Sequence, residues 1–303
     1  MKKFLVKIGE FLKKAFVFIK EGFKNKILPW LREFLKKPRV KQGMKIAGIA
    51  VLAVALIFGG IKLISFSKTA YLRPYIKEYN IEFPKGILEE MCDEYGKDQS
   101  IVGRVDISDI PTEKYVSGKE KENCLMLEKG GNIEKEQHFR AICYNEASTD
   151  LESLYSTANL FLKSSQTVSF TTLFDKEEYK VVAAFYTNTK PEDDNGYLFP
   201  YNFCGNMSEK DFKAYEDRIV HRTLYNTGYE FSYDDYFLTL SEPSDFMKDF
   251  RFVVVCVKAG KRGVQKSDTA TPNEKIHFPQ VWYDENNEQN PYIFAGKWYP
   301  KAF

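Results

Sequence analysis

The sequence contains few of the residues that most often carry metal and thiol chemistry. It has three histidines, none in an H-x-x-x-H arrangement, and five cysteines, none in a C-x-x-C arrangement. Zinc sites and thioredoxin-like motifs need such spacings, so we expect no metal and no cofactor. An odd number of cysteines leaves one or two disulfides open, with no pairing that the sequence indicates. The residues are His138, His221 and His277, and Cys92, Cys124, Cys143, Cys204 and Cys256.

The chain also lacks an even distribution of charge. Its formal net charge is +2, but residues 1–45 hold 14 Lys and Arg against 3 Glu, while residues 67–303 hold 29 Lys and Arg against 39 Asp and Glu. An acidic larger part argues against a nucleic-acid partner. With 44% hydrophobic residues and no internal repeat, the chain is expected to fold.

One long apolar run separates the two parts. Residues 46–61, IAGIAVLAVALIFGGI, contain no polar side chain, and the apolar character extends past Lys62 to Phe66. At about 1.5 Å per residue, a helix of this length spans roughly 30 Å, the thickness of the hydrocarbon core of a bilayer. The run begins too far into the chain for a signal peptide, and no A-x-A-like cleavage site follows it. Because it is apolar on every face, we favour a transmembrane helix at residues 45–66 over a buried core helix.

The basic segment before this run sets the expected orientation. Lys and Arg are dense up to Lys45 and sparse after the run, which predicts a cytoplasmic N-terminus and an extracellular part from about residue 67 onward. Within residues 2–37, apolar residues recur at steps of three and four with Lys between them, which is typical of a basic amphipathic helix. We expect a single-pass cell-membrane protein, with membrane lipid as partner of residues 45–66 and of this helix. The alternative for the helix is docking to a cytoplasmic protein.

The outer part is rich in short β-type runs, which indicate an antiparallel barrel or sandwich in one domain. Helical patterns cover residues 70–97, 149–164 and 209–222, the last started by Ser208 as N-cap. The β-type runs are residues 100–107, 124–127, 139–144, 167–174, 179–187, 237–241 and 251–257.

Three phrases follow one another in a recognisable order: IVGRVDI (101–107), TVSFTTLFDKEEYKVVAAFYTN (167–188) and FLTLSEPSDFMKDFRFVVVCV (237–257). They resemble phrases of the class B sortases, membrane-anchored cysteine transpeptidases that join surface proteins to the Gram-positive cell wall. The family's last phrase reads L-T-L-S-T-C, with an arginine about eight residues later that opens an apolar strand. Residues 238–241 match its first four letters one for one. The resemblance covers about residues 70–258 and implies a mostly β fold, a sortase-like closed antiparallel β-barrel with a few helices.

The resemblance fails at the catalytic residues. The family's cysteine aligns with Pro243, and Glu242 replaces the preceding threonine; the histidine position falls on Asn145 or Glu146, depending on the gap. Proline carries no nucleophile, and neither Asn nor Glu replaces an imidazole near neutral pH. Arg251 falls where the family places the arginine that holds the substrate. We therefore expect no catalytic residues, and a catalytically degenerate protein that acts as a cell-surface binding or scaffolding partner.

The same resemblance suggests binding residues for a peptide or a surface protein. Arg251 and Glu242 are candidates, although Arg251 has the alternative of pairing with a nearby carboxylate such as Asp249 or Glu242. The segment 195–206 lies where sortase-like folds flank the groove, and its aromatic residues either bind a partner or pack over the barrel. The candidates in this segment are Tyr197, Phe199 and Tyr201.

An active sortase-type cysteine transpeptidase with a relocated thiol is the alternative. Cys143 lies in the segment that would hold the histidine, and Cys204 precedes the helix that carries His221. Burial is the commoner explanation for such cysteines. In either case, the predicted organisation is a cytoplasmic basic amphipathic segment (1–44), a transmembrane helix (45–66), an extracellular barrel domain (67–258) and an aromatic C-terminal extension on or beside the barrel (259–303).

Overall fold

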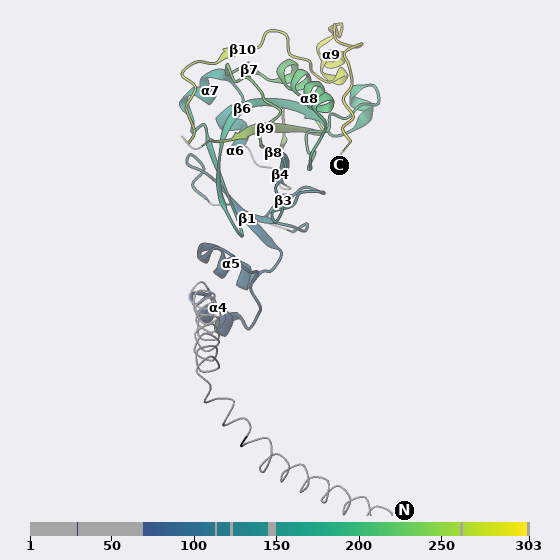
Figure 1. Ribbon diagram of the computed structural model, residues 1–303. Coiled ribbons are helices and arrows are strands. Elements are labelled where there is room, and N and C mark those ends of the chain that lie inside the picture. The colour runs from purple at the N-terminus through teal and green to yellow at the C-terminus, as the bar shows by residue number, and fades with distance from the viewer. Residues whose placement is uncertain are drawn as a thin grey trace, which may run out of the picture. The chain divides into compact units, whose positions relative to one another are not determined.

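The computed structural model describes residue 29 and residues 69–112, 114–121, 124–144, 150–260 and 263–301. Residues Tyr71–Phe303 form one compact unit. Within this unit, eight strands close into a barrel in the order β1-β2-β3-β4-β8-β9-β6-β5. Figure 1 labels β1, β3, β4, β6, β8 and β9 of this barrel. The predicted transmembrane helix, and all of the predicted amphipathic helix except residue 29, lie outside the described residues. Among the residues that are described, no helix has the length and apolar character needed to cross a membrane.

The prediction of a mostly β, closed barrel is confirmed, and each of the seven predicted β-type runs is a barrel strand. The sequence did not predict β2, a short strand in which Val116 and Ser117 are the buried residues. The barrel strands are β1 (Ile101–Ile107), β2 (Lys114–Ser117), β3 (Leu125–Leu127), β4 (Phe139–Tyr144), β5 (Thr167–Thr172), β6 (Lys176–Asn188), β8 (Phe237–Ser244) and β9 (Phe250–Lys258). A separate two-stranded sheet pairs β7 (Tyr225–Asn226) with β10 (Thr271–Pro272).

The sequence suggested an antiparallel barrel, but two of its ladders are parallel. The ladders β2–β3 and β4–β8 are parallel, whereas the other six are antiparallel. Parallel neighbours need a connection that returns the chain to the starting end of the first strand. Between β4 and β8 the chain contributes helices, two further barrel strands and long loops, so it has ample length to return.

The described helices precede the barrel, interrupt it and follow it. The predicted helix at 149–164 is two helices, because Thr157 leaves helical geometry and its hydroxyl accepts a hydrogen bond from Leu160 N as an N-cap. The predicted helix at 209–222 is confirmed as α8, with Ser208 as its N-cap. The elements are α4 (Leu72–Tyr79), η2 (Glu89–Met91), α5 (Cys92–Lys97), α6 (Asp150–Tyr155), α7 (Ala158–Lys163), η3 (Pro191–Asp194), α8 (Glu209–Arg222) and α9 (Gln280–Asn286).

The two faces of the barrel wall build two separate cores. The inner core takes residues from all eight barrel strands, and the outer core packs α8 and Trp298 against β4, β6, β8 and β9. Along β8, Leu238 and Leu240 belong to the inner core and Phe237 to the outer core. Because side chains alternate along a strand, Glu242 faces inward while Ser241 and Pro243 face outward.

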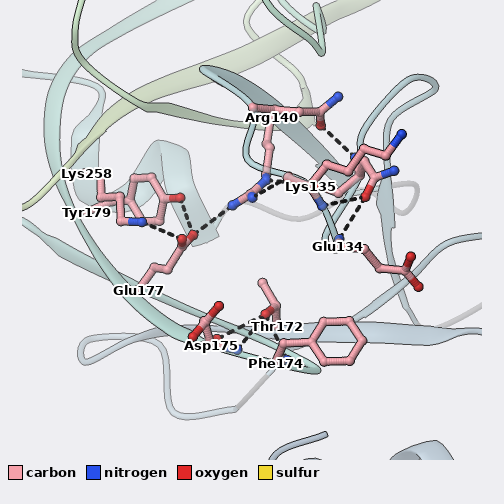
Figure 2. A network of polar contacts seen from close by, with 11 residues as sticks. Glu134, Lys135, Arg140, Thr172, Phe174, Asp175, Glu177, Tyr179 and Lys258 are labelled. Carbon is pink, nitrogen blue, oxygen red and sulfur yellow. Dashed lines mark hydrogen bonds and ion pairs between the residues drawn. The ribbon is translucent and has the colours of Figure 1, made fainter. Parts of the chain in front are cut away.

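A buried charge network crosses the inside of the barrel (Figure 2). Glu177 of β6 accepts hydrogen bonds from Arg140 Nη1 of β4 at 2.8 Å, from Lys258 Nζ of β9 at 2.6 Å and from the Tyr179 hydroxyl at 2.6 Å. Since β8 and β9 separate β4 from β6 in the wall, the Arg140–Glu177 pair spans the lumen rather than neighbouring strands. Burial raises the pKa of Glu177, but its hydrogen bonds and cationic neighbours outweigh burial and leave it lowered.

We predict that Glu177→Gln lowers the free energy of unfolding by about 3–5 kcal/mol at neutral pH, because it leaves two cations around a neutral group. A carboxylate whose folded pKa is lowered contributes stability above its unfolded pKa, and that stability is lost as pH falls through the folded pKa. The difference from wild type should therefore shrink in acid. Urea unfolding at several pH values measures both effects. Glu209→Gln, at an exposed ion pair with Lys213, is the control and should change little; an equally small loss for Glu177→Gln would refute the network's importance.

Candidate functional site

The residues that resemble the sortase phrase meet on the outer face of β8 and β9. Pro243 lies directly opposite Arg251 in the antiparallel β8–β9 ladder. On the other side of β8, Cys143 of β4 lies opposite Ser241 in a parallel ladder. The fold therefore brings Cys143, Ser241, Pro243 and Arg251 together, although they come from three strands.

The guanidinium of Arg251 is held by its own chain. Its Nη2 donates to the backbone oxygens of Tyr144 at 2.7 Å and of Ser241 at 2.9 Å, and its Nε donates to the Ser241 hydroxyl at 3.2 Å. These bonds join β9 to β8 and to the end of β4. Of the two carboxylates that the sequence offered as partners of Arg251, Asp249 instead pairs with Lys190 at 2.6 Å.

Glu242, the other candidate beside Pro243, lies on the inner face of β8 and is 0% exposed. Its Oε1 accepts a hydrogen bond from Glu152 N, in the first turn of α6, at 2.8 Å. The Glu152 side chain in turn accepts hydrogen bonds from the hydroxyls of Tyr186 at 2.9 Å and Ser244 at 2.8 Å. A carboxylate at a helix N-terminus satisfies free backbone N–H groups. Glu242 thus links the first turn of α6 to strand β8 on the inner face of the barrel wall, whereas Arg251 lies on the outer face.

The three aromatic candidates of segment 195–206 differ in burial. Tyr197 and Phe199 are each 2% exposed in the outer core, and Tyr197 exchanges hydrogen bonds with the backbone of Trp298. Packing over the barrel, the alternative to binding, fits these two residues. Tyr201 is half-buried and lies close enough to Arg251 for that cation to act on its hydroxyl, although burial is the largest effect and raises its pKa to about 12.

Cys143 lies next to Arg251 but is not an activated thiol. Burial and the carboxylate of Glu128 raise its pKa to about 12, and the opposing effect of Arg251 is smaller. Burial also raises the pKa of Cys204, to about 11. All five cysteines are free of disulfides. Sequence reasoning did not single out Glu128, because it reaches this site through the pairing of β3 with β4.

The histidines have other neighbours. His138 packs edge-on against Tyr233 and Tyr236, with ring centroids 5.8 and 4.8 Å away. His221 and His277 stack on each other at 4.7 Å. Asn145 and Glu146, the positions that align with the family's histidine, lie outside the described residues. Within the described ranges, no group of three His, Cys, Asp or Glu is arranged to hold a metal ion.

Comparison with known proteins adds solved structures but no family. No protein-family model matches the chain, and no curated protein matches it. The chain is similar to Clostridium perfringens sortase B at 13% identity, with a TM-score of 0.47 over 55% of this chain and 98% of that one. It is similar to the Staphylococcus aureus sortase B-substrate complex at 13% identity, with a TM-score of 0.48 over 67% of this chain and 98% of that one. It is also similar to B. anthracis sortase B in complex with AAEK1 at 13% identity, with a TM-score of 0.48 over 66% of this chain and 100% of that one.

We predict that Arg251→Ala lowers the free energy of unfolding by about 1–3 kcal/mol, because it leaves three acceptors without their donor. Arg251→Lys should recover little, since an ammonium group cannot reproduce the planar guanidinium fork. Urea unfolding checks both, with Lys190→Ala as a nearby control that breaks an exposed ion pair. If Arg251→Ala unfolded like the wild type, its donors would be available to a ligand and the structural role would be wrong.

Proposed function

We propose that this chain is a membrane-anchored, catalytically degenerate sortase-like protein that binds or scaffolds a partner at the cell surface without cutting it. The observation that carries the proposal is the pairing of Pro243 with Arg251 across β8 and β9, within the phrase that resembles the family's catalytic motif. Where the motif would place a thiol on this face, the chain has a pyrrolidine ring.

The chemistry of transpeptidation requires that missing group. A thiolate attacks the peptide carbonyl, the amine leaves, and a second amine then takes the acyl group from sulfur. In hydrolytic triads, loss of the nucleophile or the base lowers turnover on the order of 10⁶-fold. Asn145 or Glu146 at the histidine position supplies no imidazole to activate a substitute.

The bonding of Arg251 favours scaffolding over peptide capture. Its Nε and Nη2 donate to Ser241 and Tyr144, so these donors are not directed at a bound peptide. The basic amphipathic segment 1–44 adds a second interaction surface in this proposal, on the cytoplasmic side of the predicted anchor. A scaffold that links a cytoplasmic partner or membrane lipid to the surface domain uses both ends of the chain.

The second candidate function is an active cysteine transpeptidase that uses Cys143. The position of Cys143 opposite Ser241, within the influence of the Arg251 cation, is the observation in its favour. Against it stands the raised pKa of this thiol. With a pKa of about 12, the thiolate fraction at pH 7 is on the order of 10⁻⁵. Cys204, with a pKa of about 11, is likewise almost entirely protonated at pH 7.

Iodoacetamide labelling of the full chain at pH 7 separates these candidates. We expect Cys143 and Cys204 to react slowly, because both thiols are buried and protonated. A Pro243→Cys variant is the matched positive control, since Pro243 is half-buried and its replacement thiol would be alkylated faster than either. Fast alkylation of one native cysteine, together with loss of a transpeptidation signal in its Ser variant, would contradict the proposal.

A pull-down with and without residues 1–40 tests where a partner binds. We expect a partner on the cytoplasmic side to be lost when residues 1–40 are deleted and to be retained in Arg251→Lys and Tyr201→Ala. Both variants keep the amphipathic segment intact and serve as matched controls. Loss of the partner in these two variants alone would show that the outer face of the barrel, not the inner segment, holds it.

A further inference from the structure

A small cavity lies between the C-terminal end of α8, the turn η3 and residues 290–297. Its volume is about 40 Å³, and its lining includes Arg218, Arg222, Lys297, His277 and the carboxylate of Asp194. A water molecule needs roughly 10–15 Å³ of such space, so the cavity has room for a few waters or one small polyatomic ion. Three permanent cations against one carboxylate give the lining a net positive charge.

Arg222 is the most buried cation of this cavity, and its guanidinium stacks on aromatic rings. The residue is 9% exposed, and within the described residues its guanidinium makes no hydrogen bond or ion pair. The recorded neighbours of its guanidinium are the rings of Phe199 at 4.8 Å and Tyr197 at 5.8 Å. A guanidinium presents five N–H donors. Those of Arg222 are not among the fully buried side-chain atoms without a partner, so they keep access to solvent where the residue lines the cavity.

Two structural roles account for a positive charge at Arg222, but neither gives its N–H donors an acceptor. Stacking on aromatic faces and a position at the C-terminal end of α8 both favour a cation here. Neither supplies an acceptor in the plane of the guanidinium. Asp194, the carboxylate in the lining, accepts a hydrogen bond from Gln280 N at 3.0 Å, and no ion pair between Asp194 and Arg222 is recorded in the described part of the chain.

The other cations are fixed around the cavity by groups of the protein. Arg218 donates to Gly296 O at 2.6 Å and pairs with Asp217, while Lys297 Nζ donates to Asn195 O at 3.1 Å. These contacts join α8, the loop after η3 and the C-terminal segment, which are far apart in sequence. The positive lining is therefore built by the tertiary fold rather than by one flexible loop.

His277 lines the same cavity and lies near the cations Arg222 and Arg218. It is 9% exposed, its ring stacks on Tyr292 at 3.5 Å, and its Nδ1 is buried without a hydrogen-bond partner in the structure. Burial lowers the pKa of His277 to about 4, and the neighbours His221, Arg222 and Arg218 add to this effect. A neutral imidazole has one donor nitrogen and one acceptor nitrogen, so His277 can donate at most one hydrogen bond to a group in the cavity.

We propose that this cavity binds a small oxyanion, a phosphate or a carboxylate group, with Arg222 as its principal donor and Lys297 as a second cation. Arginine suits both groups because its fork of donors matches two oxygens at once. Arg222, Lys297 and His277 are separate from the residues around Arg251 and Pro243, so the proposal does not rest on the function proposed above.

Thermal unfolding of the full chain tests the proposal. Inorganic phosphate and sodium acetate are titrated separately against sodium chloride at matched ionic strength. We expect at least one oxyanion to raise the Tm with a saturating concentration dependence, because a ligand that binds the folded state alone stabilises it by mass action. Which anion acts identifies a phosphate or a carboxylate site. Chloride at the same ionic strength should not act.

Variants distinguish a built site from a general salt effect, since phosphate also stabilises proteins by exclusion from their surface. Arg222→Gln should abolish the saturable shift, and Lys297→Gln should weaken it at least threefold in midpoint concentration. Lys213→Gln, an exposed cation on the same helix, is the control and should bind like the wild type. If Arg222→Gln fails to fold, Lys297→Gln decides. No saturable shift with either anion, or an equal shift in the wild type and Lys297→Gln, would overturn the proposal.

Discussion

Three hydrogen bonds from the guanidinium of Arg251 hold strands β9, β8 and β4 together on the outer face of the barrel. Arg251 on β9 donates to Ser241 on β8 and to the last carbonyl of β4, and the neighbouring register sets Pro243 opposite Arg251. A catalytic site built on the sortase-like phrase would need a nucleophile at position 243 and donors free for the substrate. The chain has a proline and donors that serve its own strands, so the same geometry that fixes the wall underlies our proposal of a binding or scaffolding protein.

The buried cations of this molecule differ in what surrounds their charged groups. Arg140 is matched by Glu177 inside the barrel, and Arg251 by backbone oxygens on the wall. Arg222 is nearly as buried as Arg140, but its guanidinium stacks on aromatic rings, and the nearby Asp194 carboxylate acts on it without forming an ion pair. Because a buried charge is stable when paired and hydrogen-bonded, the exception points to a group that the protein takes from solution.

The sequence predicted the wall of the barrel better than its connections. Runs such as FRAICY and RFVVVCV are apolar and β-branched enough to indicate strands alone, whereas KYVS of β2 is a strand because its neighbours pair with it. The parallel ladder of β4 and β8 depends on a long connection that no local pattern encodes. At the site, the motif located Pro243 and Arg251. The inward direction of Glu242, the burial of Tyr197 and the cavity at Arg222 arise from tertiary packing, which residue type alone does not indicate.

The most direct test of the central claim is the intact mass of the full chain after incubation with a peptide thioester and triglycine at pH 7. An activated thiol would exchange with the thioester, release the small thiol and carry the acyl group until the amine removed it. The account predicts an unchanged protein mass and no peptide–triglycine product beyond the uncatalysed background. A single acyl adduct on Cys143 or Cys204 that triglycine then discharges into product would contradict it.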